Sequence, residues 1–399
     1  ASRNILRQKL RTAMTLAAIV IGVAGLILSG GFVQDIFIQL GEAFIHSQTG
    51  HIQVFRKDYL EKGSRQPERF LIDAPDKLAA TIAASPGVES VSSRLNFAGL
   101  LNNGKRDLGI IGEGVEPDKE ARIGTYVKVT AGRPLTDKDQ YGVFIGQGVA
   151  HSLNLHPGDS VNLVMNTSDG ALNTLEFTVV GIFQSFSQEF DARAVRIPLR
   201  AAQELLATKG ANLLVVSLNR TEDTDTVFKG LSGQIDRDKL DIKTWRQLSD
   251  FYDKTIVLYD RQFGVLQLII LFMVLLSVIN SMNMSTFERI SEFGTLQALG
   301  NREKDVFRLL MYESCILGAI GATAGVIFGM LLALGISAIG IPMPPPPIGN
   351  VGYTAYIRLV PSTIVSAWII GFLATVLASI LPAKRIVRMP IVDALRQSI

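Results

Sequence analysis

The sequence predicts a membrane protein with four transmembrane helices and one large α+β domain outside the bilayer, held between the first and second helices. Of the 399 residues, 48% are hydrophobic and 19% are charged, and the mean hydropathy is +0.29. This balance is too apolar for an ordinary soluble protein and too charged for a chain buried entirely in lipid. Four long uncharged stretches and one long polar segment between the first two account for it.

Each uncharged stretch is long enough to cross a bilayer. About 20 apolar residues span the hydrocarbon, and a charge at the centre of such a helix costs about 2.5–3.5 kcal/mol. The first stretch follows Arg3, Arg7, Lys9 and Arg11 and so resembles a secretory signal. Its apolar region is too long for one, and we interpret it as an uncleaved anchor.

The distribution of basic residues predicts that both ends of the chain are cytoplasmic. The N-terminal arm carries the four basic residues just named, and the C-terminal tail carries four more, whereas the loop between the third and fourth stretches has only Arg358. Basic residues favour the cytoplasmic side of a membrane. The tail residues are Lys384, Arg385, Arg388 and Arg396.

Helical periodicity continues beyond the membrane at both ends of the outer segment and predicts two stalks. Ile36, Leu40 and Phe44 recur at fourfold spacing after the first span, and an aromatic face that begins at Trp245 leads into the second. The predicted organisation is a cytoplasmic arm (1–11), a first span (12–34), a stalk (35–47), an outer domain (48–244), a second stalk (245–261), a second span (262–285), a cytoplasmic coupling helix with the lead-in to the third span (286–313), a third span (314–340), a proline-rich outer loop (341–358), a fourth span (359–383) and a cytoplasmic tail (384–399).

The outer domain contains a strand–helix–strand unit near its beginning and a comparable one near its end. These two halves, 48–123 and 209–244, are expected to form one porter-like subdomain. Residues 124–208 are expected to form an inserted, mostly β subdomain, and 166–173 is a candidate hairpin within it.

The polar stretch between the second and third spans predicts a corner made of two helices. Glu288, Arg289 and Glu292 lie on one side of a short amphipathic helix at the membrane surface. Gly300 ends this helix, and Asn301 is expected to cap the next one. We interpret the corner as the docking point of a separate motor protein. The apolar residues at threefold spacing are Ile290, Phe293, Leu296 and Leu299.

Small residues form a ridge along the third span. Gly321, Gly325 and Gly329 recur every four residues, with Gly318 beside them. Such a ridge lets a second helix approach closely and predicts tight helix packing.

The sequence lacks a complete motif for catalysis or for nucleotide or metal binding. Residues 99–106 match the spacing of a phosphate loop up to Lys105, but Arg106 replaces the hydroxyl residue that would hold magnesium. The single cysteine, Cys315, lies in an apolar run, and the charge pattern lacks a nucleic-acid footprint. The outer carboxylates are interpreted as a solvated surface. Histidines at 46, 51, 151 and 156 are expected on the surface, so neither a metal nor a cofactor is expected on this chain.

Three stretches together resemble one family. The sequence FERISEFGTLQALG at 287–300, the opening RNILRQKLRT at 3–12 and the tail motifs PAKR at 382–385 and MPIVDALR at 389–396 are similar to FtsX-type permease domains and to MacB and LolC/LolE-type permeases. The resemblance covers the whole chain and is nearest to the lipoprotein-releasing group, toward which GHIQVF at 50–55 also leans.

The resemblance implies a mechanotransmission ABC transporter in the bacterial inner membrane, with the large domain in the periplasm. Two permeases, identical or different, would pair, and a cytoplasmic ATPase dimer would bind ATP and Mg²⁺ and grip the coupling helix. MacB carries a fused ATPase, which is missing from this sequence, so the motor would be a separate chain. The residues implied at the ATPase contact are Phe287, Glu288, Arg289, Glu292, Phe293, Gly294, Leu299 and Gly300.

The same resemblance implies that hydrophobic cargo, such as a lipoprotein, leaves the outer leaflet of the membrane through a cavity between the two permeases. A periplasmic lipid or lipoprotein chaperone or an adaptor would receive it. MacB-like efflux of drugs, peptides or toxins and FtsX-like signalling to a cell-wall hydrolase remain alternatives. The residues expected to line the cavity, in contact with membrane lipids, are Phe32, Ile36, Phe37, Leu40, Ile256, Tyr259, Phe263, Leu266 and Met273.

Overall fold

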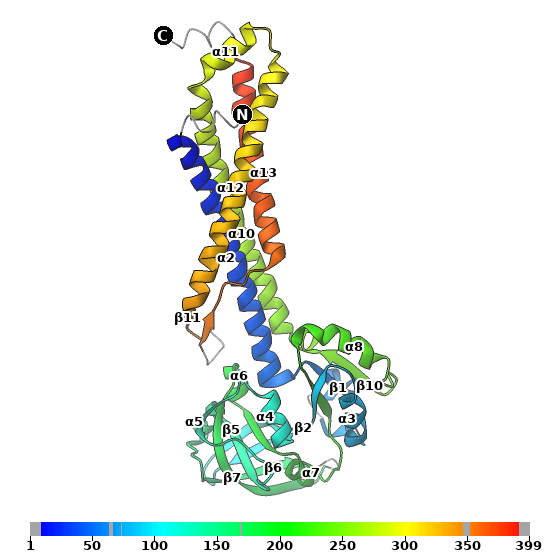
Figure 1. Ribbon diagram of the computed structural model, residues 1–399. Coiled ribbons are helices and arrows are strands. Elements are labelled where there is room, and N and C mark those ends of the chain that lie inside the picture. Colours follow the sequence, from blue (N-terminus) through cyan, green and yellow to red (C-terminus); the bar gives the residue numbers. More distant parts are fainter. Residues whose placement is uncertain (1–8, 64–66, 73, 168–169, 346–351, 391–399) are drawn as a thin grey trace. The chain divides into compact units, whose positions relative to one another are not determined.

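The computed structural model describes residues 9–63, 67–72, 74–167, 170–345 and 352–390. Most of the predicted N-terminal arm and C-terminal tail, and part of the proline-rich loop, lie outside these residues. The chain divides into two compact units, which are described separately here (Figure 1). The membrane unit comprises 1–38, 255–342 and 354–399, and the α+β unit comprises 39–254 and 343–353.

Four long helices confirm the predicted transmembrane class. They are α2 (Lys9–Phe44), α10 (Asp250–Phe287), α12 (Glu303–Ile339) and α13 (Pro361–Val387), and each is long and apolar enough to cross a membrane. Helix α2 runs past residue 34 without a break and continues as a π-helix, η1 (Ile45–Thr49). The short strands β11 (Ile341–Met343) and β12 (Tyr353–Ala355) pair before α13.

The glycine ridge of α12 lies against two neighbouring helices. A Cβ added at Gly325 would lie 2.8 Å from Val23 of α2, closer than real contacts allow. The core of the bundle includes Ile19, Val23 and Val278, which close approach of the helices brings together. The nearest neighbours of the other three glycines are Ile19 for Gly321 (2.9 Å), Ala24 for Gly329 (3.0 Å) and Thr375 of α13 for Gly318 (3.2 Å).

Helix α10 leaves most of its apolar surface uncovered. Only 11% of its span is buried within the protomer, against 33% for α12 and for α13 and 50% for α2. This helix is therefore the least buried of the four within the protomer. Its exposed apolar residues include Val257, Leu258, Val265, Leu266, Leu268, Ile269, Phe272, Met273 and Leu276.

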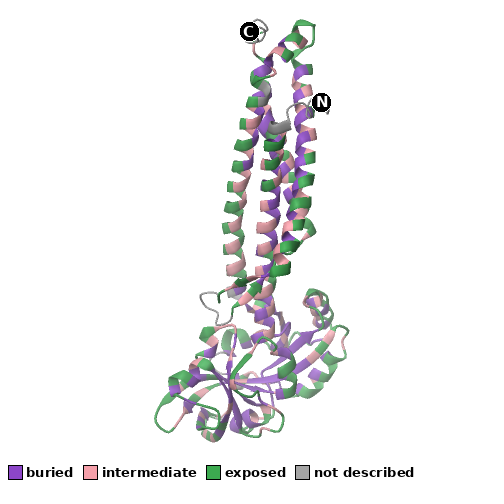
Figure 2. Cartoon of the chain, turned by 60° about the vertical axis from the view of Figure 1, so that its left-hand side comes forward, coloured by how far each residue is buried: buried purple, intermediate pink, exposed green. Residues whose placement is uncertain are grey.

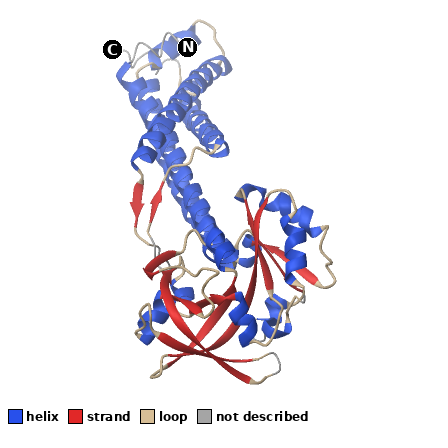
Figure 3. Cartoon of the chain, turned by 60° about the horizontal axis from the view of Figure 1, so that its bottom comes forward, coloured by secondary structure: helices blue, strands red, loops and turns tan. Residues whose placement is uncertain are grey.

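The α+β unit is built on a mixed ten-stranded sheet in the order β10-β1-β9-β2-β3-β8-β5-β7-β4, with β6 paired to β2 and β7 (Figure 3). The strands are largely buried, and the helices that cover them expose their outer faces (Figure 2). The strands are β1 (Ile52–Arg56), β2 (Val88–Asn102), β3 (Asp107–Val115), β4 (Lys128–Gly132), β5 (Gly142–Gly146), β6 (Ser160–Asn166), β7 (Leu172–Gln184), β8 (Ala194–Pro198), β9 (Leu213–Leu218) and β10 (Leu240–Thr244). The helices are η2 (Tyr59–Gly63), η3 (Pro67–Arg69), α3 (Pro75–Ala83), α4 (Pro117–Ile123), α5 (Gln147–Leu153), α6 (Gln188–Asp191), α7 (Leu199–Leu205), η4 (Thr221–Asp223), α8 (Thr224–Ser232) and α9 (Trp245–Leu248).

Two hydrophobic cores divide this unit into two lobes. The first lobe buries residues of β1, β9, β10, α3 and α8 around Val54 and Leu214, and the second buries residues of β3 and β5–β8 around Phe177. Leu95, Phe97 and Leu101 lie in the second core, although the division at residue 124 assigned them to the first. The reason is that the β2–β3 hairpin pairs with β6 and β8 of the second lobe.

The expectation of one continuous stalk helix over 245–261 is wrong. Helix α9 ends at Leu248 and α10 begins at Asp250, with Ser249 between them. A capping box of Thr244 and Gln247 begins α9. The Trp245 ring packs against Gly41 of α2 and lies 4.7 Å from that of Tyr252, centroid to centroid.

The sequence that imitates a phosphate loop is a β-hairpin. Residues 99–102 end β2, a turn follows, and β3 returns antiparallel from Asp107. A phosphate loop leads from a strand into a helix, so the context differs. The candidate hairpin at 166–173 joins β6 to β7, with Asn166 paired to Leu172, and residues 168–169 lie outside the described part of the chain.

Candidate functional site

The predicted corner consists of the end of α10, the short helix α11 (Ile290–Ala298) and the start of α12. Gly300 adopts φ +99°, which an L side chain rarely tolerates, and ends α11. The prediction that Asn301 caps α12 is wrong, because Arg302 holds that position. Asn301 instead donates from its backbone N–H and from Nδ2 to the Leu296 carbonyl, at 3.1 Å each, and so closes α11.

Arg289 fastens the turn between α10 and α11 to α12. Its Nη1 donates to both carboxylate oxygens of Glu313 at 3.0 Å, and its Nε donates to Glu292 at 3.1 Å. The guanidinium also lies 5.0 Å from the centre of the Phe293 ring. Although burial alone would lower it, the pKa of Arg289 is raised by the charge of Glu313 and by Glu292. The turn is thus held by a charge pair of which only 11% of each side chain is exposed.

The inner face of α11 packs against the ends of two long helices. Phe293 is buried in one cluster with Val306 and Leu310 of α12 and with Ile386 of α13. Gln297 donates from Nε2 to the Val387 carbonyl at 3.3 Å. Helix α11 is therefore in direct contact with both α12 and α13.

The eight residues implied at the ATPase contact separate into two groups. Arg289 is partly buried, and Phe293 and Gly294 are buried, so these three hold the corner together from within. Leu299 is 78% exposed and Phe287 is 47% exposed, so two large apolar side chains face outward here. The outward-facing group, here called the corner surface, comprises Phe287, Glu288, Glu292, Leu299 and Gly300.

A buried set of four charges in the α+β unit was not predicted. Arg94 of β2, Glu113 of β3, Glu120 of α4 and Arg196 of β8 are each less than 10% exposed. Arg196 Nε donates to Glu113 at 2.8 Å, and Arg94 donates to Glu120 from Nε at 3.1 Å and from Nη2 at 2.5 Å. Burial alone would raise the pKa of Glu113, but the charges of Arg196 and Arg94 lower this pKa below its ordinary value. The interpretation of the outer carboxylates as a solvated surface is therefore wrong for Glu113 and Glu120.

The same two arginines hold the C-terminal end of the first long helix. Arg196 Nη2 donates to the Ser47 carbonyl at 3.1 Å, and Arg94 Nη1 donates to the Gln48 carbonyl. Both acceptors belong to η1, whose last carbonyls lack partners within the helix. Arginine side chains from strands of both lobes therefore bind the same helix end.

Two histidines also differ from the surface position expected of them. His51 is 1% exposed; its Nδ1 accepts from the Leu218 N–H at 3.1 Å, and its Nε2 lies 3.1 Å from the Thr221 hydroxyl. Burial, together with the nearby His46, lowers the pKa of His51 to about 4. His46 is partly buried, whereas the histidines at 151 and 156 are exposed as expected.

A buried carboxylate lies in the membrane unit directly after the predicted first span. Asp35 is 0% exposed and accepts from Arg358 Nε and from the Tyr356 N–H, at 2.8 Å each. The Arg358 N–H donates to the Gly31 carbonyl at 3.2 Å. The sequence indicated a role for Arg358 only in the orientation of the spans, whereas in the structure its pair with Asp35 joins the segment before α13 to α2.

The predicted cargo-cavity residues lie on two helices. Phe32, Ile36, Phe37 and Leu40 are half-buried on α2, and Ile256, Tyr259 and Phe263 are half-buried on α10. Leu266 and Met273 are 40% and 67% exposed on α10. Their role stays a prediction.

The fold and the corner define the class of protein: a multi-pass membrane protein with a large α+β domain inserted after the first span. Two family models match it, the MacB-like periplasmic core domain over 12–233 and the FtsX-like permease C-terminal domain over 264–391. The chain belongs to the MacB/FtsX family of ABC transporter permeases, as its sequence motifs indicated.

Relatives of this chain include proteins named after different transport functions. An uncharacterized ABC transporter permease of Methanocaldococcus jannaschii is 26% identical over 67% of this chain and 65% of its own length. The lipoprotein-releasing system transmembrane protein LolC of Xylella fastidiosa is 23% identical, over 65% of this chain and 64% of its own length. The chain thus spans just under two thirds of the length of these two relatives. A macrolide export ATP-binding/permease protein MacB of Rhodospirillum rubrum is 28% identical over 63% of this chain and 37% of its own length.

Among solved structures, the periplasmic region of MacB from Actinobacillus actinomycetemcomitans is similar, with a TM-score of 0.38 and 15% identity. That match covers 52% of this chain and 94% of the MacB region.

Proposed function

We propose that this chain is the membrane subunit of an ABC transporter and that a separate ATPase drives it through the corner surface. One observation carries this proposal. Leu299 and Phe287 are exposed on either side of α11, and the opposite face of α11 packs against α12 and α13. Aromatic side chains such as the exposed Phe287 are enriched at protein interfaces. ATP and Mg²⁺ would be bound by the partner ATPase dimer, and this chain would act as a lever.

The bracing of α11 supports mechanical coupling. The bond from Arg289 to Glu313 and the cluster around Phe293 connect α11 to α12 and α13. Because packed elements of this kind shift as units, movement of α11 by a partner would move the long helices with it. In the proposed orientation, the long helices span the inner membrane of a bacterium. Both termini and the corner are cytoplasmic, and the α+β unit lies in the periplasm.

A second permease, identical or related, is the proposed partner in the membrane. The uncovered apolar face of α10 would meet that partner on one side and admit hydrophobic cargo from the outer leaflet on the other. The nine predicted cavity residues on α2 and α10 include the exposed Leu266 and Met273 of this face. The name of the LolC relative supports lipidated cargo, passed on to a periplasmic chaperone.

Efflux through an adaptor is the second candidate. It is supported by the match of residues 12–233 to a MacB-like periplasmic core domain and by the macrolide export relative. The two functions differ in what accompanies the complex. A lipoprotein or lipid chaperone that purifies with the complex from native membranes, identified by mass spectrometry, would favour extraction, and a periplasmic adaptor would favour efflux.

The coupling proposal is tested by two changes at the corner surface. Leu299→Asp should weaken association with the co-purified ATPase by about tenfold or more, because truncating a central anchor costs about 2 kcal/mol. The double variant Glu288→Lys and Glu292→Lys should uncouple ATP hydrolysis from transport, while the bond from Arg289 to Glu313, which neither change removes, keeps the corner folded.

The control reverses two exposed glutamates of the α+β unit, Glu176→Lys and Glu222→Lys, which should leave ATPase binding unchanged. Normal binding and coupled hydrolysis in both corner variants would refute the proposal.

A further inference from the structure

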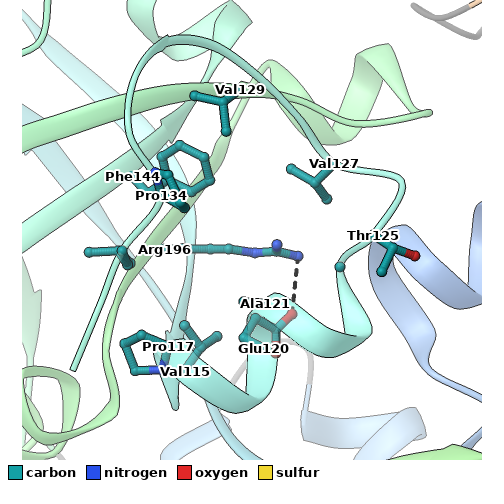
Figure 4. A pocket seen from close by; sticks show the side chains of 12 residues that line it. Val115, Pro117, Glu120, Ala121, Thr125, Val127, Val129, Pro134, Phe144 and Arg196 are labelled. Carbon is teal, nitrogen blue, oxygen red and sulfur yellow. Dashed lines mark ion pairs between the residues drawn. The ribbon is translucent and has the colours of Figure 1, made fainter.

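An open cavity in the second lobe is not used by the proposed function. Its volume is about 240 Å³, and it lies between α4, the segment that leads into β4, and strands β5 and β8 (Figure 4). Apolar groups form most of its wall, among them Val115, Ala121, Val127, Leu135 and Phe144. Figure 4 shows the Arg196 side chain extending across it, with Val127 on one side and Ala121 on the other.

Arg196 is one of two charged residues that line this cavity, and Glu120 is the other. The side chain is 4% exposed, its Nε is bound to Glu113, and its Nη2 donates to the Ser47 carbonyl. The remaining nitrogen, Nη1, lies beside Gly124 in the cavity wall, and no hydrogen bond from it joins Arg196 to any residue that the structure describes. The guanidinium, which also pairs with Glu120 at 3.7 Å, therefore has N–H groups on Nη1 that a ligand in the cavity can reach.

The charges around this donor select the ligand. Arg94 and Arg196 are balanced by Glu113 and Glu120, so the buried set is neutral as a whole. A ligand carboxylate would add an unbalanced charge close to Glu120, which itself lines the cavity, and desolvating that charge would be costly. A neutral carbonyl oxygen accepts the Nη1 proton without this penalty.

The size of the cavity suits one small apolar group. An engineered apolar cavity of about 150 Å³ binds benzene, so the larger space here accepts a ring or a short hydrocarbon chain. We propose that this cavity binds the apolar part of a neutral amphiphile whose ester or amide carbonyl accepts a hydrogen bond from Arg196. The ligand chemistry is shared by membrane lipid esters and by soluble esters.

The test uses the full chain in lipid nanodiscs and two photoreactive probes. One is a soluble hexyl ester with a diazirine on its chain, and the other is a phospholipid with a diazirine on an acyl chain. Labelling of peptides within 115–135, located by mass spectrometry, is expected from at least one probe, and which probe labels them identifies the source. The soluble ester should label about tenfold more than the matching carboxylate or hydrocarbon, as expected for one additional hydrogen bond.

Filling the cavity should abolish this labelling. Ala121→Phe occupies the space from α4, and Val129→Trp does so from β4, so the test does not depend on one variant folding. Arg122→Phe places the same ring on the exposed side of α4, away from the cavity, and should label as the parent does. The proposal is overturned if both probes leave 115–135 unlabelled, if the filled variants label equally, or if carboxylate and ester label alike.

Discussion

Removing a single charge from the buried set in the α+β unit should destabilise that unit more than removing a complete ion pair. Glu113→Met leaves Arg196 and Arg94 with only Glu120, and Arg196→Met leaves Glu113 facing Arg94 alone at 3.8 Å. Breaking a buried pair costs about 3–5 kcal/mol, whereas replacing both partners by apolar groups is often nearly neutral. The double variant Glu113→Met with Arg196→Met should therefore be more stable than the sum of the single variants predicts, by several kcal/mol.

The chain provides its own probe for this measurement. It has two tryptophans, and Trp245 is 3% exposed in the α+β unit, whereas Trp368 lies on α13. In a Trp368→Phe background, fluorescence during thermal unfolding reports on the α+β unit. For a domain of this size, each kcal/mol lowers Tm by about 2–4 °C, so each single variant should lose about 6–20 °C.

An exposed pair is the matched control. Arg220 Nε and Glu222 lie 3.6 Å apart, and 70% and 76% of these two side chains are exposed. Replacing both by methionine should shift Tm little, because water screens exposed pairs. If the two buried single variants prove additive in the double variant, the four charges do not act as one network, and the reasoning fails.

Three further predictions concern other parts of the chain. The pKa of His51 is about 4 when folded and near 6.5 when unfolded, so its contribution to the free energy of unfolding should be constant above about pH 7 and fall by about 3 kcal/mol as the pH drops from 6.5 to 4. A His51→Gln variant with the same pH dependence as the parent would contradict the assignment. Gly325→Leu should destabilise the helix bundle by about 1–3 kcal/mol in a denaturation assay, whereas Gly335→Leu, which meets no atom within 4 Å, should not, and equal effects would argue against the glycine ridge. Asp35→Ala should speed trypsin cleavage after Arg358, since the guanidinium loses its carboxylate, and an unchanged rate would mean that the pair does not hold this segment.

The membrane helices were predictable because an uncharged stretch of sufficient length has few alternatives. Strands such as β9 were equally clear, because they are short apolar runs between turn residues. The buried charges were not predictable as a network. Arg196 is the single charge of β8, but β2 carries Glu89 as well as Arg94 and β3 carries Asp107 as well as Glu113, so only the sheet order reveals that these charges meet.

The corner illustrates the same limit within one helix. Phe293 and Leu299 share the threefold spacing that predicted a single apolar face. The structure buries Phe293 and turns Leu299 outward, because α11 ends at Ala298 and Asn301 closes it by bonding back to Leu296. The spacing of apolar residues alone does not indicate the residue at which a helix ends.

The grip of Arg94 and Arg196 on the carbonyls of Gln48 and Ser47 has a consequence for the length of the preceding helix. Each residue of a helix turns it by about 100°, so one inserted residue between positions 39 and 47 would point both carbonyls away from their arginines. This part of the chain should therefore accept substitutions on its surface but neither insertions nor deletions. The number of residues here sets the rotational phase at which the helix enters the sheet.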